Sequence, residues 1–125
     1  MKIHPVMWAL ILIVCLSPNA FSQKCKGKFP DIGEYKIGGG PRIISKPQPE
    51  YTKEARRHQI TGTVVLRALF HSSGKVQDVC WVSSLPYGLT ENAIKAAYKI
   101  VFEPVEKDRQ SISVTSFIQY NFNLY

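Results

Sequence analysis

The sequence lacks the residue clusters that catalysis and metal binding require. Its three histidines, His4, His58 and His71, are spread over 125 residues, and its nine acidic residues are scattered singly. No Gly-x-Ser-x-Gly motif or paired-carboxylate pattern is present. A metal site would need more ligands than these at workable spacing. The sequence therefore predicts no enzyme, no metal ion and no cofactor.

Cysteine is scarce as well. The chain has three cysteines and no Cys-x-x-Cys motif, so a redox motif of that kind is excluded. Cys15 lies in the N-terminal apolar run, and without that run Cys25 and Cys80 remain. An even count in an oxidising compartment favours one disulfide between them. Two free thiols are the alternative, because the sequence does not give the Cα separation that a disulfide needs.

No apolar run reaches the length of a membrane-spanning helix. The longest, Val6–Leu16, has 11 residues, whereas a span needs about 20. Lys2 precedes this run, and Ala20-Phe21-Ser22 follows as a small-x-small cleavage pattern. We therefore expect residues 1–22 to be a secretory signal and the mature chain to be periplasmic. A retained inner-membrane anchor and a lipoprotein acylated at Cys15 are the alternatives.

Acidic residues are fewer than basic ones, and the net charge is +7. Removal of residues 1–22, which contain Lys2 and no acid, lowers it to +6. A basic exported protein can contact anionic lipid, lipopolysaccharide or acidic proteins. The alternative is that the charge only aids solubility. Nucleic acid is not an expected partner after export.

Residues 23–47 form a basic leader ahead of the domain that we expect over residues 48–125. Gly38-Gly39-Gly40-Pro41 cannot propagate a helix or a central strand. No helix start follows these glycines directly, so they do not form a phosphate-binding loop. Lys46-Pro47-Gln48-Pro49 predicts a stiff, extended entry to the domain.

The sequence of residues 48–125 predicts an α+β fold, with a small open antiparallel three-stranded sheet and two helices packed on one face. Thr52 is the expected cap of a short helix ending at His58. A second helix, capped by Thr90, is expected over Glu91–Val101, with Ile94, Ala97, Tyr98 and Val101 as its buried stripe. Thr63–Phe70 is apolar on both faces, which is typical of a central strand. Val76–Val82 is expected to follow it, with Val76, Cys80 and Val82 on one face.

The final strand alternates clearly from residue 112 to 124. Its even positions are mostly apolar and its odd positions are mostly polar, which indicates one buried and one wet face. A long terminal strand of this kind can leave its outer edge unpaired. That edge can recruit an extended peptide. A covering leader and an edge-to-edge homodimer are the alternatives.

Five short motifs follow one another in order between residues 48 and 104: Gln48-Pro49-Glu50-Tyr51, Gly62-Thr63-Val64, Ser73-Gly74-Lys75-Val76, Ser83-Ser84 and Phe102-Glu103-Pro104. This order resembles the C-terminal domain family of TonB, the periplasmic energy-transducing protein. Thr52 stands where the family's first motif usually has a second proline, and Ile100 where a tryptophan is usual.

The resemblance implies a partner and a mode of binding. In that family the domain binds the TonB box, a short extended peptide of outer-membrane TonB-dependent receptors, by strand addition beside its last strand. Carried over, the candidate peptide-binding residues are Gln48, Tyr51, Ile112, Val114, Ser116, Ile118, Tyr120 and Phe122.

A role in TonB-dependent transmembrane transport would follow from that mode of binding. Direct coupling to the proton-motive force would require residues 1–22 to be kept as an anchor. A non-energised interaction or adaptor module of the cell envelope is the alternative.

Overall fold

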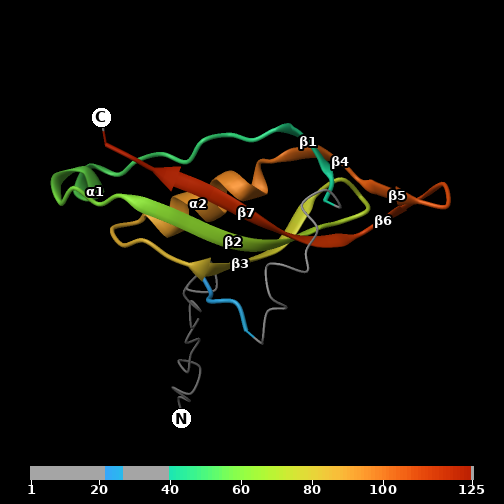
Figure 1. Cartoon of the computed structure of the whole chain (residues 1–125), viewed down its shortest axis with the longest axis horizontal. Coiled ribbons are helices and arrows are strands. Elements are labelled where there is room, and N and C mark those ends of the chain that lie inside the picture. The colour runs from blue at the N-terminus through green and yellow to red at the C-terminus, as the bar shows by residue number, and fades with distance from the viewer. Residues whose placement is uncertain (1–21, 27–39, 125) are drawn as a thin grey trace, which may run out of the picture.

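The structure is a computed structural model that describes residues 22–26 and 40–124 (Figure 1). The expected signal, apart from Ser22, and most of the leader lie outside the described residues. Two helices and seven strands are present in the described part of the chain: β1 Arg42–Ser45, α1 Lys53–Arg57, β2 Gly62–Phe70, β3 Val76–Ser83, α2 Leu89–Tyr98, β4 Val101–Glu103, β5 Val105–Lys107, β6 Gln110–Ile112 and β7 Val114–Phe122.

The main sheet has three antiparallel strands in the order β3-β2-β7. This confirms the predicted three-stranded sheet with the first long strand at its centre. Leu66 and its even-numbered neighbours on β2 are buried, while the odd-numbered positions are half-buried. A strand that is apolar on both faces is most stable with a partner on each side. β3 and β7 are therefore the two edges of this sheet.

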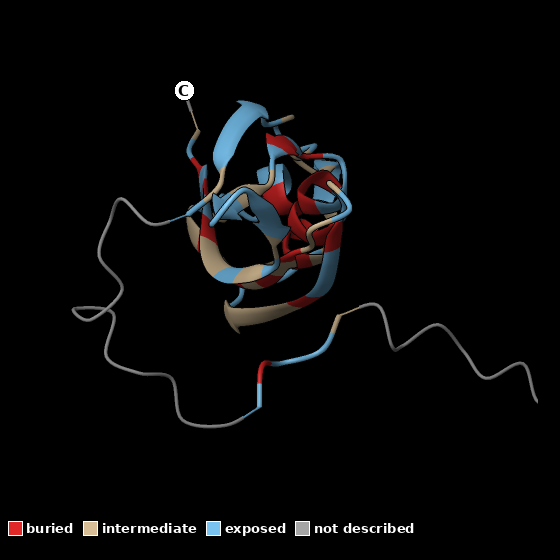
Figure 2. Ribbon diagram, turned by 90° about the vertical axis from the view of Figure 1, so that its right-hand side faces the viewer, coloured by how far each residue is buried: buried red, intermediate tan, exposed pale blue. Residues whose placement is uncertain are grey.

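Helix α2 covers one face of the sheet, and the core lies between them (Figure 2). Ala93, Ile94 and Ala97 of α2 are fully buried, as is Leu66 of β2. Helix α1 adds Ala55 to the same core. The fold class is α+β, as predicted.

Helix α2 differs from the prediction at both ends. It begins at Leu89, with Gly88 as N-cap. Thr90 is not the cap but lies inside the helix, where its hydroxyl bonds both the N–H and the carbonyl of Leu85 at 2.8 Å. Tyr98 was expected in the buried stripe but is 45% exposed. Val101 has left the helix and is the first residue of β4.

The last strand is shorter than the alternation suggested. Ile112 belongs to β6, which pairs with β5 as a separate hairpin. Asp108 and Arg109 make its turn with positive φ. Ser113 lies between β6 and β7, and its hydroxyl accepts a hydrogen bond of 2.8 Å from the N–H of Ser72. Side-chain periodicity continues across this break, which is why the sequence alone did not locate it.

Strand β3 contains a bulge that reverses its expected faces. Arg67 pairs with Cys80, but Leu69 pairs with Gln77, so β3 has one extra residue between them. Asp78 has a φ of 50° at this point. As a result Val76 and Val79 are both buried and Val76 does not share a face with Cys80.

In the described part of the chain, no helix is long and apolar enough to cross a membrane.

Candidate functional site: the outer edge of β7

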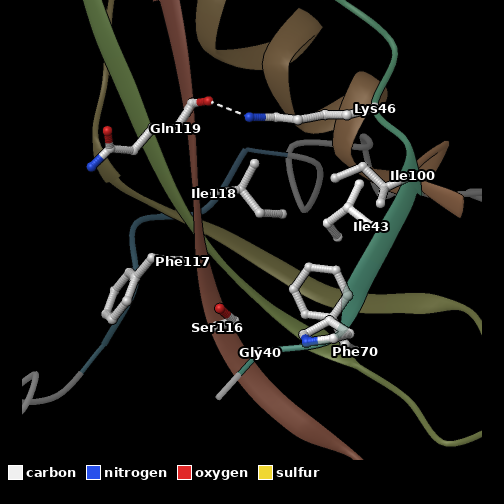
Figure 3. A pocket seen from close by; sticks show the side chains of 10 residues that line it. Gly40, Ile43, Lys46, Phe70, Ile100, Ser116, Phe117, Ile118 and Gln119 are labelled. Carbon is white, nitrogen blue, oxygen red and sulfur yellow. Dashed lines mark hydrogen bonds between the residues drawn. The ribbon is translucent and has the colours of Figure 1, made fainter. Parts of the chain in front are cut away.

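Alternate residues of β7 point their backbone N–H and C=O groups away from β2, toward the outer edge of the sheet. Paired residues in an antiparallel ladder alternate between those that exchange two hydrogen bonds and those whose N–H and C=O point outward. The carbonyl of Gln119 accepts a hydrogen bond of 2.8 Å from Lys46 Nζ, which lies on the side away from β2 (Figure 3). Gln119 therefore belongs to the outward set, together with Thr115, Phe117 and Asn121.

Strand β3 gives the same register independently. The N–H of Trp81 points away from β2 and donates to the carbonyl of Gln23 at 2.9 Å. Trp81 pairs with Leu66, so the backbone groups of Leu66 point to the other side, toward β7. Leu66 pairs there with Ile118. The N–H of Ile118 therefore bonds within the sheet, and the N–H of Gln119 does not.

The described part of the leader contacts this edge at Gly40 and Lys46, and the backbone of β1 pairs elsewhere. β1 forms a small antiparallel sheet with β4, not with β7. Lys46 contacts Gln119, and a Cβ added to Gly40 would lie 3.4 Å from Ser116 Oγ. Within residues 22–26 and 40–124, the N–H groups of Thr115, Gln119 and Asn121 have no partner outside the sheet.

A cavity of about 140 Å³ lies between the leader and β7 (Figure 3). Ile43 lines it from the leader and Ile118 from β7, while Phe70 and Ile100 are further apolar walls. Lys46 closes one end, and its ammonium lies 4.7 Å from the centre of the Tyr120 ring. Burial lowers the pKa of Lys46 from its ordinary value. Within the described segments, the N–H groups of Thr115, Gln119 and Asn121 thus lie without partners outside the sheet, beside an apolar cavity.

The opposite edge of the sheet is closed by two separate contacts. Gln23 and Cys25 hydrogen-bond both backbone groups of Trp81 at 2.9 Å. The next outward N–H on β3, that of Val79, donates to the hydroxyl of Tyr98 at 3.3 Å. Tyr98 thus contacts the edge of the sheet with its hydroxyl. On β7, the described part of the leader contributes the hydrogen bond from Lys46 to the carbonyl of Gln119.

The candidate residues from the sequence occupy two different environments. Val114, Ser116, Ile118, Tyr120 and Phe122 lie on the face of β7 turned to α2 and the cavity, and the last three are buried. Their backbone groups pair with β2. The outward groups belong to the odd-numbered residues. Register, which only the sheet pairing reveals, was needed to identify these positions.

Gln48, Tyr51 and Ile112 lie away from the middle of the edge. Tyr51 is half-buried; its hydroxyl donates to the carbonyl of Ile60, and its ring meets Phe122 edge-on at 5.5 Å between centroids. Gln48 is exposed on the extended segment before α1, and Ile112 belongs to β6. Tyr51 therefore has a packing role that accounts for its position without a ligand.

The structure confirms the disulfide between Cys25 and Cys80, whose Cα atoms are 4.9 Å apart. In the described segments, no group of three or more histidine, cysteine, aspartate or glutamate residues could hold a metal ion.

Tyr120 carries a buried hydroxyl that lacks a hydrogen-bond partner among the described residues. Burial also raises the pKa of Tyr120 from its ordinary 10.0 to about 12. The folded state therefore favours the neutral phenol, and stability from this group is lost as pH rises from about 10 to about 12. We expect Tyr120→Phe to stabilise the domain by about 1 kcal/mol at pH 7, with a further relative gain above pH 10. Urea denaturation of the wild type and of Tyr120→Phe, at pH 7 and above pH 10, measures the difference in stability. A variant that is less stable than the wild type at both pH values would contradict this expectation.

Comparison with known proteins agrees with this fold. Residues 47–124 match the family model for the C-terminal domain of the Gram-negative bacterial TonB protein. The solution structure of the TonB C-terminal domain from Pseudomonas aeruginosa has a TM-score of 0.56 at 20% identity, over 66% of this chain and 85% of that one. The TonB2 protein of Vibrio anguillarum gives a TM-score of 0.46 at 19% identity, over 82% and 100%. No curated protein matches. Because the family model covers more than half of the sequence, the chain belongs to the family of Gram-negative bacterial TonB C-terminal domains.

Proposed function

We propose that this domain binds an extended peptide of an outer-membrane TonB-dependent receptor, by addition of a strand to the outer edge of β7. TonB C-terminal domains work in the periplasm of Gram-negative bacteria and interact with outer-membrane receptors. The observation that carries the proposal is the difference between the two sheet edges. The β3 edge is closed at Trp81 and Val79, while β7 offers the N–H groups of Thr115, Gln119 and Asn121.

Backbone pairing would supply most of the affinity at this edge, as is general for strand addition. The apolar cavity beside Ile118 would receive a side chain from the added strand, because side chains on a strand alternate between the two faces. The peptide therefore needs an extended conformation and an apolar residue at one position. Many peptide sequences meet this requirement, so peptides from several receptors could bind at the same site.

Lys46 must leave the carbonyl of Gln119 before a peptide N–H can bond there. We therefore expect Lys46→Met to raise peptide affinity by about three- to tenfold, the equivalent of one hydrogen bond of about 1 kcal/mol. Isothermal titration with a synthetic peptide from a receptor's N-terminal segment measures this. Lys75→Met is the matched control, because it removes the same charge at the exposed turn between β2 and β3.

Either of two results would count against this proposal. If the peptide does not bind to wild type or to Lys46→Met at millimolar concentration, strand addition at β7 is wrong. If Lys46→Met binds more weakly than wild type while Lys75→Met is unchanged, Lys46 contacts the peptide and does not compete with it.

A further inference from the structure

A short piece of the leader acts as an added strand on the β3 edge. Lys24 is paired with Trp81 in a parallel bridge. The N–H of Cys25 donates to the carbonyl of Trp81, and the N–H of Trp81 donates to the carbonyl of Gln23, both at 2.9 Å. This segment lies beside β3 in Figure 1. The edge of β3 is thus able to accept an extended chain, and here it accepts the protein's own.

Among the described residues, few contacts besides the disulfide hold this segment in place. Of the described residues 22–26, only Cys25 is buried. Lys24 Nζ lies 5.8 Å from the centre of the Trp81 ring, which is a weak contact at an exposed site. Two backbone hydrogen bonds offset only a small part of the entropy lost when a segment of this length is ordered. The covalent bond between Cys25 and Cys80 therefore decides whether the segment stays.

We propose that the Cys25–Cys80 disulfide is a redox-sensitive clamp on the β3 edge. While the disulfide is formed, residues 23–25 occupy the edge at Trp81. When it is reduced, this segment detaches from β3, and the N–H and C=O of Trp81 lose their partners on Gln23 and Cys25. The proposal concerns β3 and does not depend on peptide binding at β7.

The reductant is a dithiol, either a protein with a Cys-x-x-Cys site or dithiothreitol. Its thiolate attacks Sγ of Cys80, the less buried of the two cysteines. The S–S bond breaks, and its electron pair leaves on Sγ of Cys25, which takes up a proton. The second thiol of the reductant then displaces Sγ of Cys80 from the mixed disulfide. Two electrons and two protons have been transferred, and the reductant leaves as a disulfide.

The N–H of Val79 provides a control on the same edge. It donates to the hydroxyl of Tyr98, a residue of α2, and so it does not depend on the leader. The N–H of Ile118 reports on the other side of the sheet, where it pairs with β2. If the leader is released locally, the hydrogen-exchange rate of the Trp81 amide rises, while the rates of the Val79 and Ile118 amides do not change.

Hydrogen exchange of the full-length ¹⁵N-labelled chain, before and after reduction with dithiothreitol, tests the clamp. We expect the Trp81 amide to exchange at least tenfold faster in the reduced protein, with Val79 and Ile118 unchanged. Alkylation of free thiols and mass measurement show that the disulfide is broken. Cys25→Ser should reproduce the reduced pattern without reductant.

Three results would overturn the proposal. The Trp81 amide could remain protected after reduction, which would mean that backbone pairing alone holds the leader. All amides could accelerate together, which would make the disulfide a global stabiliser of the fold. The disulfide could also resist dithiothreitol in the native protein, and then no redox response exists.

Discussion

Gln119→Pro should weaken the binding of an extended peptide at least tenfold while the domain stays folded. The N–H of Gln119 points out of the sheet, so its loss removes no bond between β7 and β2. Proline is tolerated on an edge strand when its nitrogen faces outward. The proline ring would, however, occupy the position of a bond to the added strand. We expect affinity to fall at least tenfold, measured by isothermal titration with a receptor-derived peptide.

Two further variants make this result specific. Gln119→Ala removes the side chain but keeps the N–H, so it should bind as wild type does. Ile118→Pro removes an N–H that pairs with Leu66 inside the sheet, and we expect it to destabilise the domain clearly more than Gln119→Pro does, because a ladder hydrogen bond is lost. Unfolding followed by circular dichroism compares the stabilities of Gln119→Pro and Ile118→Pro. If Gln119→Pro binds normally, or if Ile118→Pro is as stable as Gln119→Pro, the register assigned to β7 is wrong.

Leu66→Ala should be among the most destabilising single changes, with a loss of about 2–5 kcal/mol. Leu66 is fully buried at the centre of β2, beneath α2, and the cavity left behind would have strands on both sides. Val65 is half-buried on the face without a helix. Val65→Ala should therefore lower the free energy of unfolding much less, by about 1 kcal/mol. Urea denaturation compares the two, and equal losses would contradict a core confined to one face.

Periodicity predicted the elements that pack against one common core. The alternating positions of β2 and β7, and Ile94 with Ala97 on α2, are buried as expected. A strand or helix with one apolar face buries that face in only one orientation, with the face turned toward the core. The orientation of these elements could therefore be predicted from the sequence. The two cysteines were likewise paired correctly, because only one pairing was available after Cys15 was set aside.

The features that were missed depend on contacts between distant residues. The bulge at Asp78 shifts the register of β3 against β2, and β7 begins only at Val114, next to the hydrogen bond from Ser72 to Ser113. Tyr98 was expected to be buried but is 45% exposed, and its hydroxyl accepts a hydrogen bond from the N–H of Val79. Each of these features involves residues that lie far apart in the sequence. Sequence spacing carries no information about such partners.

The candidate site also depends on contacts that the sequence does not give. The alternation of β7 identified which side chains are buried, but strand addition uses backbone groups that point sideways. Which amides are free depends on the pairing of Leu66 with Ile118, and this pairing is fixed by the fold. The odd-numbered residues, such as Gln119, therefore emerged only from the structure. Lys46 was also missed, since nothing in the leader's sequence places it on β7.

Strand addition at β7 is tested most directly by a backbone amide titration of the full-length ¹⁵N-labelled chain with a receptor-derived extended peptide. We expect the largest shifts at Thr115, Gln119 and Asn121, smaller shifts at Lys46 and none at Trp81. Shifts centred on Trp81, or no shift at millimolar peptide, would contradict it, because β7 would then not be the edge that receives the strand.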